Sequence, residues 1–330
     1  MGLVEPSKKA VPAKGNFKYS APIIEIPPAP DYALKIRHKY FAGWEQTYLL
    51  TADEHLDSPE CYINLWHNHM REAKEKNALV VNAGDMFDVI SGRHDKRGSK
   101  GTIREEHSKV NYIDRVVDWG ADELKPYADQ LVYVGTGNHE MSVLVNTETD
   151  VTARVLEKVN SYRSKDLPPI YRAGFTGWIR FMFENPKDGG RFSWNMKIEH
   201  GTGGNSPVSK GVLEAHRRSA RVEGATFLVS GHIHERWHME HVVETLNSST
   251  GRIEQRPYEH IQLGSYKRDF RTDGVGTWFM MKMGSTKPIG GKWLRFWCDN
   301  GKDVKYVITN TWVPYSDLTK YLRKSKIVTE

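Results

Sequence analysis

Gly231-His232-Ile233-His234 directly follows an apolar run, Thr226-Phe227-Leu228-Val229-Ser230. Such a run is typical of a buried strand. At the end of a strand, just after a glycine, the chain can turn and aim both histidine side chains at one cavity. That arrangement suits a metal site, although an isolated His-x-His pair is as often two surface or packing histidines as two ligands. Other parts of the sequence are needed to distinguish a metal site from a pair of surface or packing histidines.

The composition indicates a globular protein with a sizeable core. Of its 330 residues, 38% are hydrophobic and 11% aromatic, which is enough for one large domain or two small ones. No apolar run approaches the roughly 18 to 20 residues of a membrane span. The start of the chain, Met1 to Lys14, lacks the apolar core of a secretory signal. We therefore expect no membrane association and a cytoplasmic location.

The cysteine and charge content bear on the cellular compartment and on the kind of partner. Two cysteines, Cys61 and Cys298, are too few for a disulfide framework and fit a reducing compartment. The chain has 47 Lys and Arg against 41 Asp and Glu, a net charge of 47 − 41 = +6. A basic excess of this size suits a polyanionic partner but does not require one. The sequence indicates no particular oligomeric state.

The order of apolar runs predicts an α/β protein with two sheets. Residues 1–31 are rich in proline and lysine and predict an extended arm. We expect one domain over residues 32–300 and a C-terminal extension, 301–330, that packs on it. The predicted strands include 47–51, 78–82, 131–134 and 226–230. The predicted helices start at Ser58-Pro59, include the apolar stripe from Val110 to Val117, span 151–162, and start again at Ser206-Pro207, where Val208, Val212 and Leu213 would face inward. Short strands with Gly-rich turns are expected over 240–313.

Polar clusters follow the ends of these apolar runs. Their members are Asp53 and His55, Asp85 and Asp88, Asn138 and His139, His200, and His232 and His234. Because strand ends meet at one edge of a sheet, we expect the clusters to converge. Carboxylate, imidazole and amide groups form a mixed set suited to manganese, iron, zinc or cobalt, and the candidate ligands are too many for one four-coordinate ion. Two metal ions about 3.5–4 Å apart would use them, and such pairs hydrolyse phosphoesters with a bridging water.

In this order, the motifs DxH, GDxxD, GNHE, HG and GHxH resemble those of the calcineurin-like metallophosphoesterase superfamily. The resemblance implies a two-sheet β-sandwich flanked by helices and two bound divalent ions, manganese being the leading expectation. It also implies a role for each motif residue. One ion would be held by Asp53, His55, Asp85 and His234, and the other by Asp85, Asn138, His200 and His232. His139 would be the general acid for the leaving oxygen, with Asp88 orienting it.

Residues around the second and third motifs bear on the substrate. The protein Ser/Thr phosphatases carry Arg-Gly directly after GDxxD, where this chain has Val89 and Ile90. The block Gly84-Asp85-Met86-Phe87-Asp88 is more similar to the DNA-repair exonuclease branch, although that branch ends its third motif in Asp where Glu140 stands here. We therefore expect hydrolysis of phosphodiesters, with DNA or RNA as the leading substrate. A nucleotide or other small phosphoester is the alternative, and a non-catalytic scaffold is a further one.

A basic loop follows the GDxxD motif. Four of its residues are candidates for contact with substrate phosphates, although a solvated charged loop is the ordinary interpretation: Arg93, Lys96, Arg97 and Lys100. Other residues whose types are common in functional sites are expected to have structural roles only. They are the tryptophans Trp66, Trp194, Trp278 and Trp297 and the histidines His67, His69, His238 and His241.

Overall fold

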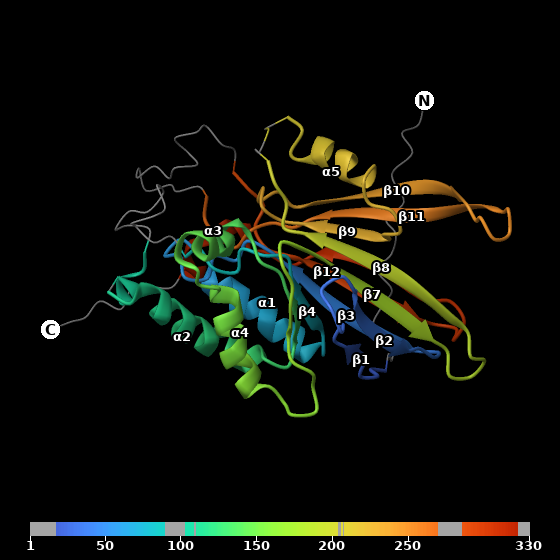
Figure 1. The fold of residues 1–330 in the computed structure, drawn as a ribbon, viewed down its shortest axis with the longest axis horizontal. Helices are drawn as coiled ribbons and strands as arrows, with labels where there is room; N and C mark the ends of the chain where they lie inside the picture. Colours follow the sequence, from blue (N-terminus) through green and yellow to red (C-terminus); the bar gives the residue numbers. More distant parts are fainter. Residues whose placement is uncertain are drawn as a thin grey trace.

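Two β-sheets form the centre of the protein (Figure 1). The computed structural model describes residues 18–89, 103–108, 110–203, 206, 208–269 and 286–322. Within these ranges, one sheet has the strand order β1 (Ile23–Glu25), β2 (Leu34–Lys39), β7 (Thr176–Glu184), β8 (Arg191–Glu199), β9 (Phe227–Ser230), β11 (Ile253–Gln262), β10 (Trp237–Leu246). The other has the order β13 (Lys305–Asn310), β12 (Lys292–Cys298), β3 (Trp44–Thr51), β4 (Leu79–Asn82), β5 (Leu131–Val134), β6 (Tyr171–Arg172).

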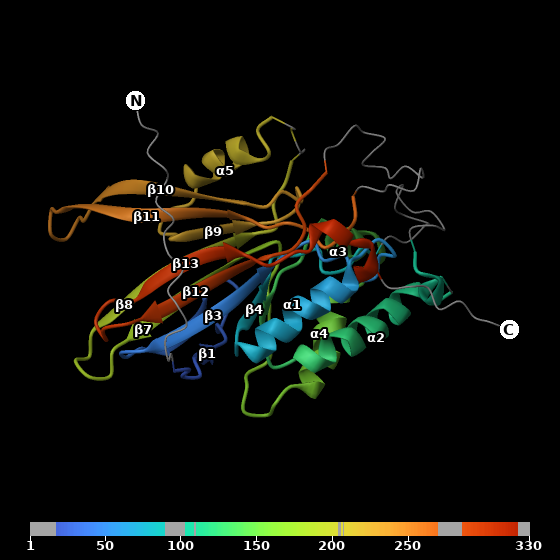
Figure 2. The same ribbon diagram turned by 180° about the vertical axis from the view of Figure 1, so that it is seen from behind.

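Helices cover the outer faces of the two sheets. The α-helices are α1 (Ile63–Glu75), α2 (Tyr112–Leu124), α3 (Asn138–Thr147), α4 (Val151–Tyr162) and α5 (Val212–Ser219). Short 3₁₀ turns span Glu105–His107, Lys125–Tyr127, Tyr315–Asp317 and Thr319–Tyr321. In both ribbon views α1, α2 and α4 lie together beside the six-stranded sheet, whereas α5 lies alone beside β9, β10 and β11 (Figures 1 and 2). The predicted two-sheet α/β architecture with flanking helices is confirmed.

The core between the sheets is aromatic. Phe181 of β7 packs against Tyr48 of β3 and Phe296 of β12, with ring centroids 5.0 and 5.2 Å apart. His38 is buried in the same core, and its Nε2 lies 2.8 Å from the Tyr48 hydroxyl. Burial lowers the pKa of His38 to about 3, so the ring is neutral and belongs to the packing. Side chains alternate between core and exterior along β2 and β7, as strands with one buried face require.

Parallel pairing determines where polar residues gather. β3, β4 and β5 are adjacent and parallel, so their carboxyl ends lie at one edge of the six-stranded sheet. β9 is parallel to both β8 and β11, so these three strands end together in the other sheet. Each of these strands except β11 is followed within a few residues by one of the polar clusters predicted from sequence.

Several element boundaries differ from those predicted. The strand 131–134 and the helix 151–162 are confirmed. The helix predicted from Ser58-Pro59 begins later, at Ile63, because residues 58–60 form a turn. The predicted inward position of Val110 is wrong, since this residue precedes α2 and is exposed. α3 was not predicted, and β10 and β11 have 10 residues each, so the expectation of short strands there was wrong as well.

The helix predicted at Ser206-Pro207 is the largest error. α5 begins at Val212, after Gly211 with a φ of 83°. Val208 is 93% exposed and Leu213 54% exposed, so neither faces inward as predicted. These apolar residues have a spacing that would suit a buried helix face, but they are not buried here. Other side chains attach the helix to the sheet.

Both ends of the described chain pack on the sandwich. Ile24 of β1 pairs with Ile36 of β2, so part of the segment predicted as an arm extends the seven-stranded sheet. After β13, Leu318 and Tyr321 pack against a cluster that includes Leu65 of α1. Among the residues described, no helix combines the length and apolar character needed to cross a bilayer.

Leu294 tests the inter-sheet core. This β12 side chain is 0% exposed, whereas Leu246 at the end of β10 is 65% exposed. Leu294→Ala should lower the free energy of unfolding by about 2–5 kcal/mol, because it removes buried methyl groups and leaves a cavity. Leu246→Ala, the same change at an exposed position, should stay within about 0.5 kcal/mol of wild type. Equal effects in denaturant titrations would contradict the assignment of the core.

Candidate metal centre

The site is built from turns with unusual backbone conformations. Five of the predicted ligands have left-handed φ values: Asp53 (51°), His55 (48°), Asp85 (52°), His232 (71°) and His234 (56°). A left-handed residue turns the chain sharply after a strand, at a cost that Asp, Asn and His tolerate better than most side chains. These turns bring side chains from strands of both sheets to one place.

Backbone amides fix the two central carboxylates. Oδ2 of Asp53 accepts a hydrogen bond from the His232 N–H at 2.8 Å, and Oδ1 of Asp85 accepts one from the His139 N–H at 2.9 Å. Each carboxylate thus has one oxygen held by main chain and a second that faces the histidines. Glycines make room for this arrangement. A Cβ at Gly231 would lie 2.5 Å from Asp53 Oδ2, and one at Gly137 would overlap Asp85 Oδ1.

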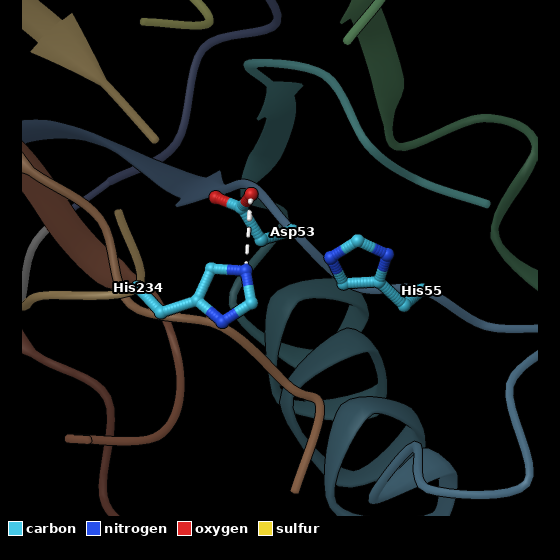
Figure 3. Close-up of side chains that lie close together, drawn as sticks. All are labelled: Asp53, His55 and His234. Atoms are coloured by element: carbon cyan, nitrogen blue, oxygen red, sulfur yellow. Dashed lines mark ion pairs between the residues drawn. The ribbon is translucent and has the colours of Figure 1, made fainter. Parts of the chain in front are cut away.

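Asp53, His55 and His234 form the first candidate group (Figure 3). Each offers one ligand atom, and these atoms all lie within 4.8 Å of one another. His234 Nε2 lies 3.5 Å from Asp53 Oδ1, while its Nδ1 lies 2.8 Å from Asp269 Oδ2. Because a carboxylate only accepts, Nδ1 carries a proton for Asp269, and Nε2 faces the centre. A carboxylate behind a histidine in this way is the usual support of a metal ligand.

Asp85, His200 and His232 form the second group. Asp85 Oδ2 lies 3.2 Å from His200 Nε2. Nδ1 of His200 donates to the carbonyl oxygen of Ala83 at 3.0 Å, which again leaves Nε2 for the centre. Asn138 completes this group, since its Oδ1 lies 3.1 Å from His200 Nε2 and 2.7 Å from His232 Nδ1.

The two groups are continuous, and their donor atoms fit a pair of divalent ions. His200 Nε2 lies 4.0 Å from Asp53 Oδ1, so it connects them. Asp53 Oδ1 and His55 Nε2 are buried polar atoms with no hydrogen-bond partner. Buried polar atoms without partners are costly, and a cation between them would satisfy both. All seven residues predicted as ligands therefore lie together, in an arrangement that fits the ions.

The electrostatics of the centre also favour cations. Burial alone lowers the pKa of His200, but Asp85 and Asp53 outweigh it and raise the pKa to about 9. For His234, burial is likewise outweighed, chiefly by Asp269, and the pKa rises to about 10. Both imidazoles therefore carry a proton at neutral pH, at positions where a metal ion would otherwise supply the positive charge.

His139 lies at the edge of the cluster. Its Nδ1 donates to the main-chain oxygen of Asp88 at 2.7 Å, so Nε2 is the nitrogen that exchanges a proton. Nε2 lies 3.8 Å from Asp85 Oδ2. The Asp88 carboxylate is shared more widely than predicted. Its Oδ1 lies 3.3 Å from His139 Nδ1, 3.0 Å from His55 Nδ1 and 2.7 Å from Lys267 Nζ.

Supporting residues were missed by sequence reasoning. Asp269 and Lys267 follow β11, and they are close to the centre because β11 is parallel to β9. The parallel pairing was the missing signal, since residues after β11 share the edge. Asp57 accepts from the Val89 N–H at 3.0 Å, and Glu140 caps α3 by accepting from the Gly137 N–H at 2.9 Å. These bonds hold the loops on which the ligands lie.

The remaining sequence candidates fall elsewhere. The four basic loop residues Arg93, Lys96, Arg97 and Lys100, together with Trp278, lie outside the described residues. His67 bonds Glu123 and Tyr127 on the helical side of the protein, and His69 bonds Tyr266 and the Trp312 carbonyl. His238 bonds Glu259, with Nε2 to Oε2 at 2.6 Å.

Comparison with known proteins finds only weak structural similarity. No family model matches the sequence, and no curated protein matches it either. A predicted phosphoesterase from Streptococcus pneumoniae TIGR4 is 12% identical, with a TM-score of 0.28 over 82% of this chain and 94% of that one. GAP50, the anchor in the inner membrane complex of Plasmodium, is 10% identical, with a TM-score of 0.37 over 85% and 95%. Vps29 of Entamoeba histolytica, complexed with Zn²⁺, is 11% identical, with a TM-score of 0.28 over 80% and 99%. Similarity at this level carries no argument about activity.

Metal binding should release protons. His200 and His234 are protonated at neutral pH because their pKa values are about 9 and about 10, and a metal ion binds the neutral ring. Loading the metal-free protein with Mn²⁺ at neutral pH should release about two protons per chain, and affinity should increase as the pH rises. Calorimetric titration in two buffers of different ionisation enthalpy measures the release. In His234→Ala about one proton fewer should appear, and an unchanged release would remove His234 from the site.

Proposed function

We propose that this chain is a two-metal phosphoesterase of the calcineurin-like superfamily that hydrolyses phosphodiester bonds. The observation that carries the proposal is the single cluster of three carboxylates and five imidazoles, in which the two groups of candidate ligands meet at Asp53 and Asp85. His139 belongs to this cluster through a third group, with His55 and Asp88, but it is not one of the seven predicted ligands. Left-handed turns and buried ligand atoms without hydrogen-bond partners cost free energy. A cluster that only stabilised the fold would gain nothing from them.

Two divalent ions, with Mn²⁺ the leading candidate, would be held by the seven residues described above. When bound, they would supply a water that is nucleophilic at neutral pH and would neutralise the phosphoryl oxygens. Asp85 is the proposed shared ligand, because its Oδ1 is fixed by the His139 amide while Oδ2 faces His200. Asn138 would contribute an uncharged ligand oxygen from the first turn of α3.

The chain itself supplies the proton for the leaving group. His139 can hold a proton on Nε2, since Nδ1 is already committed to the Asp88 carbonyl. The Asp88 carboxylate lies 3.3 Å from the same Nδ1 and helps to orient the ring. Lys267 keeps Asp88 ionised, because the burial that raises the pKa of this carboxyl is outweighed by Lys267 and the two histidines. His139 is thus prepared to protonate a departing alkoxide.

Nucleic acid is the proposed substrate, and a nucleotide or another small phosphoester is the alternative. Support for a polymer comes from the net charge of +6 and from the basic loop directly after the Asp85 motif. A non-catalytic scaffold is a further alternative. It is disfavoured because a scaffold would gain nothing from the full ligand set together with His139.

His139→Ala should separate chemistry from metal binding. Metal content should remain close to wild type, because His139 is not one of the seven proposed ligands. Turnover on a substrate with a nucleoside alkoxide as leaving group should fall about 10²–10⁴-fold, since the departing oxygen loses its proton donor. Steady-state kinetics with Mn²⁺ and metal analysis of the same preparation provide the measurement.

An activated aryl phosphodiester is the matched control substrate. Its leaving group departs without a proton, so His139→Ala should cost it much less. Equal losses on both substrates would contradict the role of His139 as general acid.

The basic loop distinguishes a polymer from a small ester. Replacing Arg93, Lys96, Arg97 and Lys100 by Ser or Gln should raise the KM for DNA or RNA and flatten its salt dependence, because each cation would contact a backbone phosphate. Hydrolysis of the aryl phosphodiester should be unchanged. If neither substrate is affected, the loop is a solvated surface and the nucleic-acid proposal loses its support.

A further inference from the structure

α5 is attached to the outer face of the seven-stranded sheet by very little apolar surface. Of its eight residues, only Ala215 and Arg218 are buried. Arg218 lies 3.7 Å from both Glu199 of β8 and Glu214 of α5 itself. Both ribbon views place the helix over β9, β10 and β11 (Figures 1 and 2). A short helix with one buried methyl group needs another source of attachment to stay in place.

Three histidines meet beneath and beside this helix. His216 comes from α5, His241 from β10 and His260 from β11. The ring centroids are 4.9 Å apart for His216 and His241, 5.1 Å for His241 and His260, and 6.4 Å for His216 and His260. The strand register explains the pair on the sheet. His241 pairs with Tyr258 and Met239 with His260, so both histidines lie on the face that α5 covers.

The two sheet histidines have unsatisfied nitrogens. Nε2 of His241 and Nε2 of His260 are buried and have no hydrogen-bond partner. His260 is 2% exposed. Burial, helped by the neighbouring His241, His216 and Arg218, lowers the pKa of His260 to about 4. At neutral pH this ring is therefore uncharged, and a nitrogen lone pair is available to a Lewis acid. Leaving such groups unpaired costs free energy that a ligand can recover.

We propose that His216, His241 and His260 form a zinc site, separate from the phosphoesterase centre, that fastens α5 to the seven-stranded sheet. Three neutral imidazoles are a common ligand set for Zn²⁺, with a water in the fourth position. With Zn–N bonds of about 2.0–2.1 Å, rings around a tetrahedral ion have centroids about 5 Å apart. Two of the three separations already match this value.

The third centroid separation, between His216 and His260, has to shorten before all three rings can bind one ion. Among the residues described, this trio is not one of the groups whose ligand atoms already lie within 4.8 Å of one another. His216 is the exposed member, so its ring can rotate about its side-chain bonds towards His260 without displacing core. The positive charge of Arg218 nearby is offset by Glu199 and Glu214. A cation is therefore tolerated at this position.

Zinc binding to defined variants tests the site. All proteins carry Asp85→Asn to weaken the phosphoesterase centre, and each is stripped of metal and titrated with Zn²⁺. His216→Ala should bind one equivalent less than the parent and should lose most of the Zn²⁺-dependent increase in Tm. This variant is expected to fold, because the ring is exposed and alanine favours helix. His241→Ala should show the same loss.

His238→Ala is the matched control, since His238 lies on β10 but bonds Glu259 on the opposite face. It should bind as much Zn²⁺ as the parent. Equal stoichiometry in His216→Ala and the parent would overturn the site, and so would an equal loss in His238→Ala, which would indicate adventitious binding by surface histidines. Mn²⁺-dependent phosphodiesterase activity of the variants without Asp85→Asn is measured separately, so that failure of the zinc site and failure of the proposed function remain distinguishable.

Discussion

The hydrogen bond from the His232 amide to Asp53 Oδ2 joins the two sheets at the site. Asp53 follows β3 of one sheet and His232 follows β9 of the other, and the bond is 2.8 Å long. It sets the direction of the Asp53 carboxylate and anchors the turn that carries His232 and His234. The corresponding bond from the His139 amide to Asp85 does the same within the six-stranded sheet. These two bonds fix the carboxylates directly, and further backbone hydrogen bonds connect the loops that carry the other ligand atoms.

This arrangement costs free energy, and the surrounding backbone offsets it. Each left-handed non-glycine residue costs on the order of 1 kcal/mol or more. The Asp53 N–H donates to Gly84 and the His55 N–H donates to Asp85, at 3.0 and 3.1 Å, so the turns continue the pairing of β3 with β4. Tyr266 N–H donates to the Asp53 carbonyl at 3.0 Å and fixes the segment that carries Lys267 and Asp269. The strained turns are therefore supported on both sides, and the donors are held ready before any ion binds.

Much of the site could be predicted from sequence because the ends of neighbouring parallel strands lie at the same edge of a sheet. Polar residues that follow parallel strands share an edge, and short apolar runs such as 131–134 identify those strands well. Asp269 could not be predicted, because its position depends on β11 lying parallel to β9, a long-range pairing that no local pattern encodes. α5 was misplaced for a related reason. Its attachment depends on Arg218 and on histidines from distant strands, so apolar spacing alone pointed to Val208 and Leu213, which are exposed.

The number of Mn²⁺ ions bound by Asp85→Asn is the most direct test of two ions that share one carboxylate. Wild-type protein should retain two Mn²⁺ per chain after gel filtration. Asp85→Asn should lose both, because the shared ligand no longer carries a charge. Asp118→Asn, at an exposed position on α2 paired with Lys158, should retain both. A wild-type protein with only trace Mn²⁺, or an Asp85→Asn variant that keeps two ions, would contradict the account.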